Sequence, residues 1–191
     1  PNAPVSRPVK SVVDEIRYLM QERGVRIVDI LDDDPAYGYE HSVELFKSMA
    51  EDLPPGLEWM SNNGITGASI TEEVMYWIAK SGCKAFKVGV ESGNSDRLRS
   101  IRKPATKDSL RKAGDIFGKY PEIFVNGNYI IGFPEETFGE MMDTFDFANE
   151  LAWDWAGFLI YQPAAGTPMA EAFPSALKDA NDEEIIKGLI P

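Results

Sequence analysis

Apolar positions along the chain follow two spacings, one typical of amphipathic helices and the other of buried strands. Between Ser11 and Arg23 the apolar residues recur every three or four positions, which is the spacing of one helix face. Short and nearly continuous apolar runs follow such segments, and they are typical of strands buried in a parallel sheet. The predicted strands cover residues 25–31, 57–61, 83–90, 123–131 and 157–161.

Polar and helix-breaking residues mark the ends of the predicted helices. Gly24 ends the first helix, and Pro54-Pro55-Gly56 ends a second one. Thr71, which two glutamates follow, suits the start of a third helix that runs to Gly82. Thr137 and Glu140 match a capping box, which predicts a helix that continues to about residue 151. Two further helices are predicted over residues 97–101 and 106–120.

The alternation of strands and helices predicts an α/β fold with a parallel sheet. Strands begin about every 30 residues, which is the length of one βα unit. A complete eight-unit barrel needs roughly 250 residues, so we expect a TIM-like barrel truncated to about five strands. This barrel would occupy residues 1–170, and residues 171–191 would form a polar C-terminal tail.

Because the chain begins with a helix, we expect the first strand of a larger fold to be missing. A missing strand would leave an exposed apolar edge, and such edges attract other chains. The predicted partners are therefore the missing N-terminal segment or a second copy of the chain.

Composition narrows the class of ligand and the compartment. The 19 lysines and arginines face 31 aspartates and glutamates, so the net charge is −12. Such a charge argues against nucleic acid and anionic membranes as partners, because phosphates would be repelled. No apolar run is long enough to predict a membrane span. A single cysteine excludes an internal disulfide framework and a multi-cysteine metal site within the chain, and we predict a cytoplasmic protein with a small-molecule ligand.

Polar residues follow every predicted strand at its carboxyl end. The apolar run 86–90 leads directly into Glu91 and Ser92, which Gly89 and Gly93 flank. The carboxyl ends of parallel strands share one edge of the sheet, where ligands bind. The predicted site therefore consists of Asp32, Asp33, Asp34, Asn62, Asn63, Glu91, Ser92, Glu135, Glu136, Tyr161 and Gln162. Phe133 and Pro134 would add a rigid apolar wall for a flat ring.

Each of these groups also has a structural interpretation that the sequence leaves open. The aspartates at 32–34 could cap a helix or be solvated, and Asn62 and Asn63 before Gly64 suit any turn. Glu91 could cap the helix that follows it. Phe133 could belong to a tight turn only.

Four further residues are interpreted without a ligand. His41 is expected to be exposed at a helix start, and Cys83 is expected to be a small buried residue at the amino end of its strand. Trp153 and Trp155 lie at that same end of the sheet and are expected to contribute packing.

Several motifs occur in an order that resembles a known family. They include Gly89-Val90-Glu91-Ser92-Gly93, Ile130-Ile131-Gly132-Phe133-Pro134-Glu135-Glu136-Thr137 and Gly166-Thr167-Pro168. At these residues the chain resembles the barrel of radical S-adenosylmethionine (radical SAM) enzymes, closest to the cobalamin-binding and methylthiotransferase-like branches. The resemblance covers about residues 8–170.

The resemblance implies a partial (β/α)6 barrel and a radical reaction. In that family a three-cysteine loop after the first strand holds a 4Fe-4S cluster, and S-adenosylmethionine chelates the open iron. The reduced cluster cleaves S-adenosylmethionine, and the resulting 5′-deoxyadenosyl radical removes a hydrogen atom from the substrate. In the cobalamin-binding branch, cobalamin would be a further cofactor of the longer protein.

Motif positions imply roles for particular residues. The Asp32-Asp33-Asp34 loop would meet the methionine amino group of S-adenosylmethionine. Asn62, Glu91 and Ser92 would lie near its carboxylate and ribose. The adenine would be flanked by Ile131, Gly132, Phe133, Tyr161 and Gln162. The resemblance assigns no catalytic residue and no metal ligand within this chain.

The chain also departs from the family pattern. It has no three-cysteine loop, and Glu135-Glu136 stands where the family usually has Gly-Glu. We therefore expect an internal piece of a longer enzyme, inactive by itself and binding S-adenosylmethionine at most weakly. Two alternatives stay open: a non-catalytic binding module, and a lyase or hydrolase that binds a divalent cation through Asp32, Asp34, Glu91 and Glu135.

Overall fold

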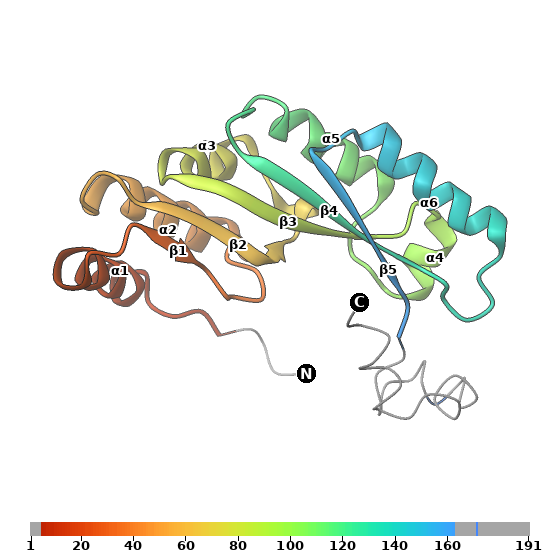
Figure 1. Ribbon diagram of the computed structural model, residues 1–191, viewed down its shortest axis with the longest axis horizontal. Coiled ribbons are helices and arrows are strands. Elements are labelled where there is room, and N and C mark those ends of the chain that lie inside the picture. The colour runs from red at the N-terminus through yellow and green to blue at the C-terminus, as the bar shows by residue number, and fades with distance from the viewer. Residues whose placement is uncertain (1–4, 163–170, 172–191) are drawn as a thin grey trace.

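Five parallel strands form one sheet, and they lie in the sheet in the order in which they occur along the chain (Figure 1). The computed structural model describes residues 5–162 and residue 171. The strands are β1 (Ile27–Asp29), β2 (Glu58–Ile65), β3 (Cys83–Glu91), β4 (Phe124–Ile131) and β5 (Trp155–Ile160). The predicted parallel α/β sheet of about five strands is therefore confirmed.

Helices connect the strands and lie along one face of the sheet (Figure 1). They are α1 (Val9–Arg23), α2 (Tyr39–Asp52), the 3-10 helix η1 (Gly67–Ser69), α3 (Glu72–Lys80), α4 (Ser95–Ser100), α5 (Lys107–Phe117) and α6 (Phe138–Leu151). All predicted helices occur, with ends that differ from the prediction by a few residues at most.

Side-chain caps determine where several of these helices begin. The Thr71 hydroxyl accepts a hydrogen bond from the Val74 amide at the start of α3. Thr137 and Glu140 form the predicted capping box, in which the Thr137 amide donates to the Glu140 carboxylate at 2.7 Å. These caps fix the loops that leave the carboxyl ends of β2 and β4.

The two faces of the sheet differ in polarity. On β3 the side chains of Phe86, Val88 and Val90 are buried, and they belong to the core between sheet and helices. The intervening residues, Lys87 and Glu91 among them, are half-buried and belong to the opposite face, because successive side chains on a strand alternate. None of the described helices covers this second face, which is called the open face below (Figure 1).

Strand β2 is longer than the sequence predicts. It passes through Asn62 and Asn63 to Ile65, with an irregular register against β3 between Ser61 and Ile65. The expectation that the strand ends at Ser61 and is followed by a turn is therefore wrong. A hydrogen bond from the Asn62 amide to the Asp29 carboxylate at 3.2 Å keeps this part of β2 alongside β1.

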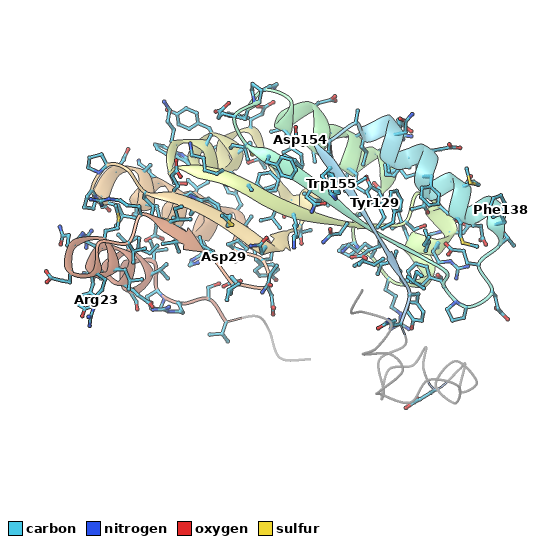
Figure 2. All side chains as sticks on the ribbon, viewed as in Figure 1. Arg23, Asp29, Tyr129, Phe138, Asp154 and Trp155 are labelled. Atoms are coloured by element: carbon cyan, nitrogen blue, oxygen red, sulfur yellow. The ribbon has the colours of Figure 1, made fainter. Side chains whose placement is uncertain are left out.

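The predictions for four single residues also have an outcome. Cys83 is buried at the start of β3, as expected, and Trp153 packs edge-on against Phe117 with ring centres 5.6 Å apart. The expectation that Trp155 contributes packing is wrong, because this residue is 60% exposed at the start of β5, on the open face (Figure 2). His41, in the first turn of α2, is half-buried rather than exposed.

The edge strands of the sheet are β1 and β5, and each of them pairs with only one other strand among the described residues. Apolar side chains are exposed there, including Ile27 on β1 and Ile160 on β5. Association through such an edge stays a prediction. Within the described part of the chain, none of the helices combines the length and the apolar character needed to cross a membrane. The predicted C-terminal tail and the Gly166-Thr167-Pro168 motif lie outside the described residues.

Candidate functional site

The three aspartates after β1 form a compact exposed loop. The Asp32 carboxylate accepts a hydrogen bond from the Asp34 amide at 3.0 Å, and the Asp34 carboxylate accepts one from the Ala36 amide at 3.1 Å. Asp32 and Asp34 thus each use one carboxylate oxygen to hold the turn, and the second oxygen accepts no hydrogen bond from a described residue. Asp33 is exposed and makes no side-chain hydrogen bond to a described residue, so it is the least constrained acceptor of the three.

Asn62 lies beside this loop, at the open face of β2. Its amide nitrogen Nδ2 donates to Asp29 Oδ2 at 2.8 Å, while its backbone amide donates to Asp29 Oδ1. The pair joins the carboxyl ends of β1 and β2. The side-chain carbonyl oxygen of Asn62 accepts no hydrogen bond from a described residue. It is therefore an available acceptor near the carboxyl ends of β1 and β2.

Glu91 ends β3 in a backbone conformation that is unusual for glutamate. Its φ is 69°, in the left-handed region, which costs a non-glycine residue about 1–2 kcal/mol. Its carboxylate pairs with the Lys103 ammonium at 2.8 Å, and both side chains are about three-quarters buried, with exposures of 21% and 24%. Both charged groups lie over Gly89, where a Cβ would be 2.9 Å from each. The absence of a side chain at residue 89 therefore gives the pair its place on the open face.

Ser92 is brought to the same loop but faces inward. It is fully buried, its hydroxyl lies 3.2 Å from the Thr144 hydroxyl on α6, and it accepts a hydrogen bond from the Asn94 amide at 3.0 Å. The Gly93 amide donates to the same Thr144 hydroxyl. In the structure Ser92 holds the loop after β3 against α6, and its predicted proximity to a ligand stays a prediction.

The loop after β4 is folded around a carboxylate. Glu136 Oε2 accepts hydrogen bonds from the backbone amides of Gly132 and Phe133, at 2.5 and 3.1 Å. Glu135, the preceding residue, has a φ of 61° and is exposed. Glu136 therefore shapes the turn from within, whereas Glu135 projects to solvent.

Phe133 and Tyr161 meet although 28 residues separate them. Their ring centres are 5.0 Å apart, and the Arg97 guanidinium lies 5.5 Å from the centre of the Phe133 ring. Only 5% of Phe133 is exposed, so its ring supports Tyr161 instead of offering an open face of its own. The half-buried Tyr161, whose amide donates to the Ile131 carbonyl at 2.8 Å, is the aromatic surface that remains accessible beside Gln162.

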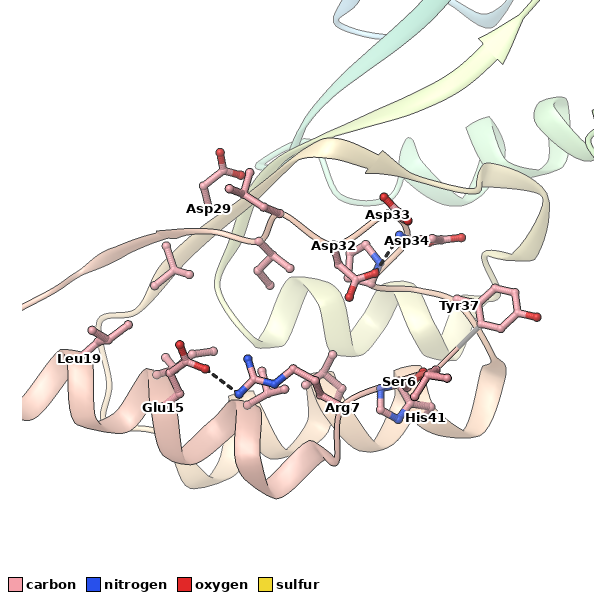
Figure 3. A pocket seen from close by; sticks show the side chains of 18 residues that line it. Ser6, Arg7, Glu15, Leu19, Asp29, Asp32, Asp33, Asp34, Tyr37 and His41 are labelled. Atoms are coloured by element: carbon pink, nitrogen blue, oxygen red, sulfur yellow. Dashed lines mark hydrogen bonds and ion pairs between the residues drawn. The ribbon is translucent and has the colours of Figure 1, made fainter. Parts of the chain in front are cut away.

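A hollow with a volume of about 780 Å³ lies between α1, β1 and the aspartate loop (Figure 3). Its walls carry the loop aspartates on one side and, on the other, the ion pair between Arg7, which precedes α1, and Glu15 of α1 (Figure 3). Of the predicted site it contains only Asp32, Asp33 and Asp34. Of the other predicted residues, Asn62 and Glu91 lie at the open face, whereas Ser92 and Phe133 are buried and Glu136 is folded into the loop after β4.

Sequence reasoning missed several polar residues of the open face. They are Asp29, Lys87, Lys103, Asn126 and Asn128. A signal for two of them was present, because Asn126 and Asn128 alternate with buried residues in a strand that the sequence suggested to be continuously apolar.

The divalent-cation alternative finds no support in the geometry. Among the described residues, no group of three or more histidine, cysteine, aspartate or glutamate side chains is arranged to hold a metal ion. Glu91, one of the four residues of that alternative, is paired with Lys103. Burial raises the pKa of the Cys83 thiol to about 12, so this cysteine is a neutral packing residue at the opposite edge of the sheet.

A family model for the radical SAM superfamily matches residues 1–148. The chain belongs to the radical SAM superfamily. Its parallel sheet with helices on one face agrees with that assignment, and the radical SAM interpretation is preferred over the cation-binding lyase or hydrolase.

Relatives and solved structures agree on the family and differ in reaction. The ribosomal protein uS12 methylthiotransferase RimO of Desulforamulus reducens is 31% identical over 173 residues, which are 87% of this chain and 39% of RimO. Cytidylyl-2-hydroxyethylphosphonate methyltransferase of Streptomyces wedmorensis is 30% identical over 173 residues, 85% of this chain and 31% of the relative. The chain therefore spans well under half the length of these relatives.

The fold is shared with a solved radical SAM methyltransferase. The structure of TsrM from Kitasatospora setae, with cobalamin and a [4Fe-4S] cluster bound, matches with a TM-score of 0.77 at 18% identity. The match covers 89% of this chain and 34% of TsrM. The described sheet is thus part of a radical SAM barrel.

Proposed function

We propose that this chain supplies the S-adenosylmethionine-binding part of a radical SAM enzyme, and that the whole protein cleaves S-adenosylmethionine reductively at a 4Fe-4S cluster. One observation carries the proposal: within the family match, Glu91 is held in a left-handed conformation at the carboxyl end of β3. Strained residues that the surroundings fix in this way cluster at ligand sites.

The chemistry of the strand ends suits the proposed ligand. S-adenosylmethionine carries an ammonium group and a sulfonium group, and the first loop presents the carboxylates of Asp32, Asp33 and Asp34. Its ribose needs hydrogen-bond acceptors, which Glu91 and the Asn62 carbonyl offer. Its adenine needs a flat apolar surface, which Tyr161 offers beside Ile131 and Gln162.

Other residues position these groups. Lys103 fixes the Glu91 carboxylate through a largely buried ion pair, and Ser92 ties the same loop to Thr144 of α6. Phe133 and Arg97 support Tyr161 from behind. In this proposal S-adenosylmethionine supplies the radical chemistry, while the protein binds, orients and shields it.

The residues of this chain do not fit the iron–sulfur cluster itself. Clusters are held by cysteine thiolates, and the chain has one cysteine, which is buried and neutral at the opposite edge of the sheet. We therefore assign the cluster to another part of the protein and derive no step through it. The predicted cobalamin is likewise assigned to no residue of this chain, and the predicted cytoplasmic location stays a prediction.

Titration of S-adenosylmethionine into the purified chain tests the proposal. We expect saturable binding that Glu91→Gln weakens at least tenfold, because the substitution removes the charge that accepts hydrogen bonds and pairs with Lys103. Glu150→Gln is the matched control, since Glu150 pairs with Arg111 on exposed helix surface away from the strand ends. A lack of saturable binding would contradict the proposal and favour a non-catalytic module. Equal affinities of the wild type and Glu91→Gln for S-adenosylmethionine would do the same.

A further inference from the structure

Three residues form a straight row across the open face, away from the strand ends. The register places Lys87 of β3 next to Asn126 of β4, and Asn126 next to Trp155 of β5. Neighbouring strands are about 4.8 Å apart, so the row spans roughly 10 Å. Lys87 lies four residues before Glu91, or about 13 Å toward the amino ends of the strands.

Lys87 is an uncompensated cation in an acidic protein. The lysines at the two ends of this region are paired, Lys84 with Glu58 at 3.7 Å and Lys103 with Glu91 at 2.8 Å. Lys87 is half-buried, and no described carboxylate lies within ion-pair distance of it. A partly desolvated ammonium group without a partner favours an anion more strongly than an exposed surface lysine does.

The neighbouring asparagines carry unused hydrogen-bonding capacity. Asn126 Oδ1 is buried and has no hydrogen-bond partner among the described residues. Both Asn126 and Asn128 direct their side-chain oxygens over Gly157, where a Cβ would lie 3.7 and 3.3 Å from them. Two amide groups therefore point to the same place, and a buried carbonyl oxygen without a partner costs free energy until a donor arrives.

Trp155 completes the row with a flat apolar surface. It is 60% exposed, and it stands at the start of β5 on the open face, close to β4 (Figure 2). An exposed tryptophan next to convergent polar groups is typical of a small-molecule site.

We infer that Lys87, Asn126, Asn128 and Trp155 bind the substrate, and that the substrate is a small organic molecule with an anionic group next to a planar group. Lys87 pairs with the anion, the two asparagines hydrogen-bond to polar groups beside it, and the planar part lies on Trp155. This inference rests on the proposed function, since the nucleoside end of S-adenosylmethionine would occupy the strand ends above this row.

A matched pair of probes tests the charge requirement. Isotope-labelled chain is titrated with 2-naphthoate and with 2-naphthamide, which have the same ring and differ in charge, and the indole N–H resonance of Trp155 is followed. We expect 2-naphthoate to shift this resonance and to bind at least fivefold more tightly than 2-naphthamide. Equal affinities, or no shift of the Trp155 resonance, would overturn the inference.

Variants separate this site from the site for S-adenosylmethionine. Lys87→Gln should reduce 2-naphthoate binding at least fivefold and leave 2-naphthamide and S-adenosylmethionine binding within twofold of the wild type. Lys84→Gln, on the same strand but at a paired lysine, should change none of the three affinities. Loss of 2-naphthoate binding in both variants would overturn the inference. Failure of S-adenosylmethionine binding with intact 2-naphthoate selectivity would instead contradict only the proposed function.

Discussion

The Arg97 guanidinium lies over the ring of Phe133, 5.5 Å from its centre, while Tyr161 contacts the same ring with its centre 5.0 Å away. Arg97 belongs to α4 after β3, Phe133 to the loop after β4, and Tyr161 directly follows β5. One cation and two rings thus join three successive strand ends. The accessible ring of Tyr161 has a fixed position because the other two groups support it.

Removal of this cation should loosen the support. We expect Arg97→Met, which keeps the apolar stem, to lower the free energy of unfolding by about 1–2 kcal/mol, the range for a desolvated cation–π contact. It should also weaken S-adenosylmethionine binding several-fold, because Tyr161 would lose its backing. Chemical denaturation and titration calorimetry measure the two effects. Arg99→Met, at an exposed position on the same helix, should change stability by less than about 0.5 kcal/mol, and equal effects of both variants would refute this account.

Gly93 sets the distance between the loop after β3 and α6. A Cβ at this residue would lie 2.2 Å from the Asp143 carbonyl oxygen and 2.7 Å from the Phe147 Cβ. We therefore expect Gly93→Ala to lower the free energy of unfolding by about 3 kcal/mol or to prevent folding. Gly139→Ala is the control, because a Cβ there meets nothing closer than 3.9 Å and alanine favours the helix. Urea denaturation measures the free energy of unfolding of both variants. A Gly93→Ala protein as stable as Gly139→Ala would be inconsistent with the close contact.

Cys83 should make the protein less stable at alkaline pH. Burial raises the pKa of its thiol to about 12, whereas an unfolded cysteine titrates near 8.5. Between these values the unfolded state loses a proton that the folded state keeps, so stability falls as pH rises, by up to about 1.4 kcal/mol per pH unit. Denaturation at pH 8 and pH 10 should show a smaller loss for Cys83→Ala than for the wild type. The same loss in both proteins would exclude Cys83 as its cause.

The sequence predicts the order of elements well because local signals specify them. Thr71 and Thr137 cap helices by hydrogen bonds to residues three positions away, and such short-range pairs are visible in the sequence. Most of β3 and the end of β4 are apolar in the sequence, although the buried residues of both strands occupy alternate positions. The sequence predicts the polar loops that follow β1, β3 and β4 for the same reason.

Contacts between distant residues could not be predicted in this way. Asn62 resembles a turn residue, yet Asp29 on a neighbouring strand keeps it within β2. The partner of Glu91 is Lys103, which lies three residues after α4 and has no motif of its own. The sequence predicts that Phe133 offers an accessible apolar surface, but Arg97 and Tyr161, which are distant in the sequence, cover its ring.

Mapping of a nucleoside ligand by NMR tests the central claim most directly. Isotope-labelled chain is titrated with S-adenosylhomocysteine, a stable analogue of S-adenosylmethionine, and backbone amide resonances are followed. We predict the largest shifts at the carboxyl ends of the strands, at Asn62, Glu91 and Gly132, with none at Cys83 and Phe124 at the amino ends. Shifts confined to the amino ends, or to the hollow between α1 and β1 around Glu15, would contradict the account.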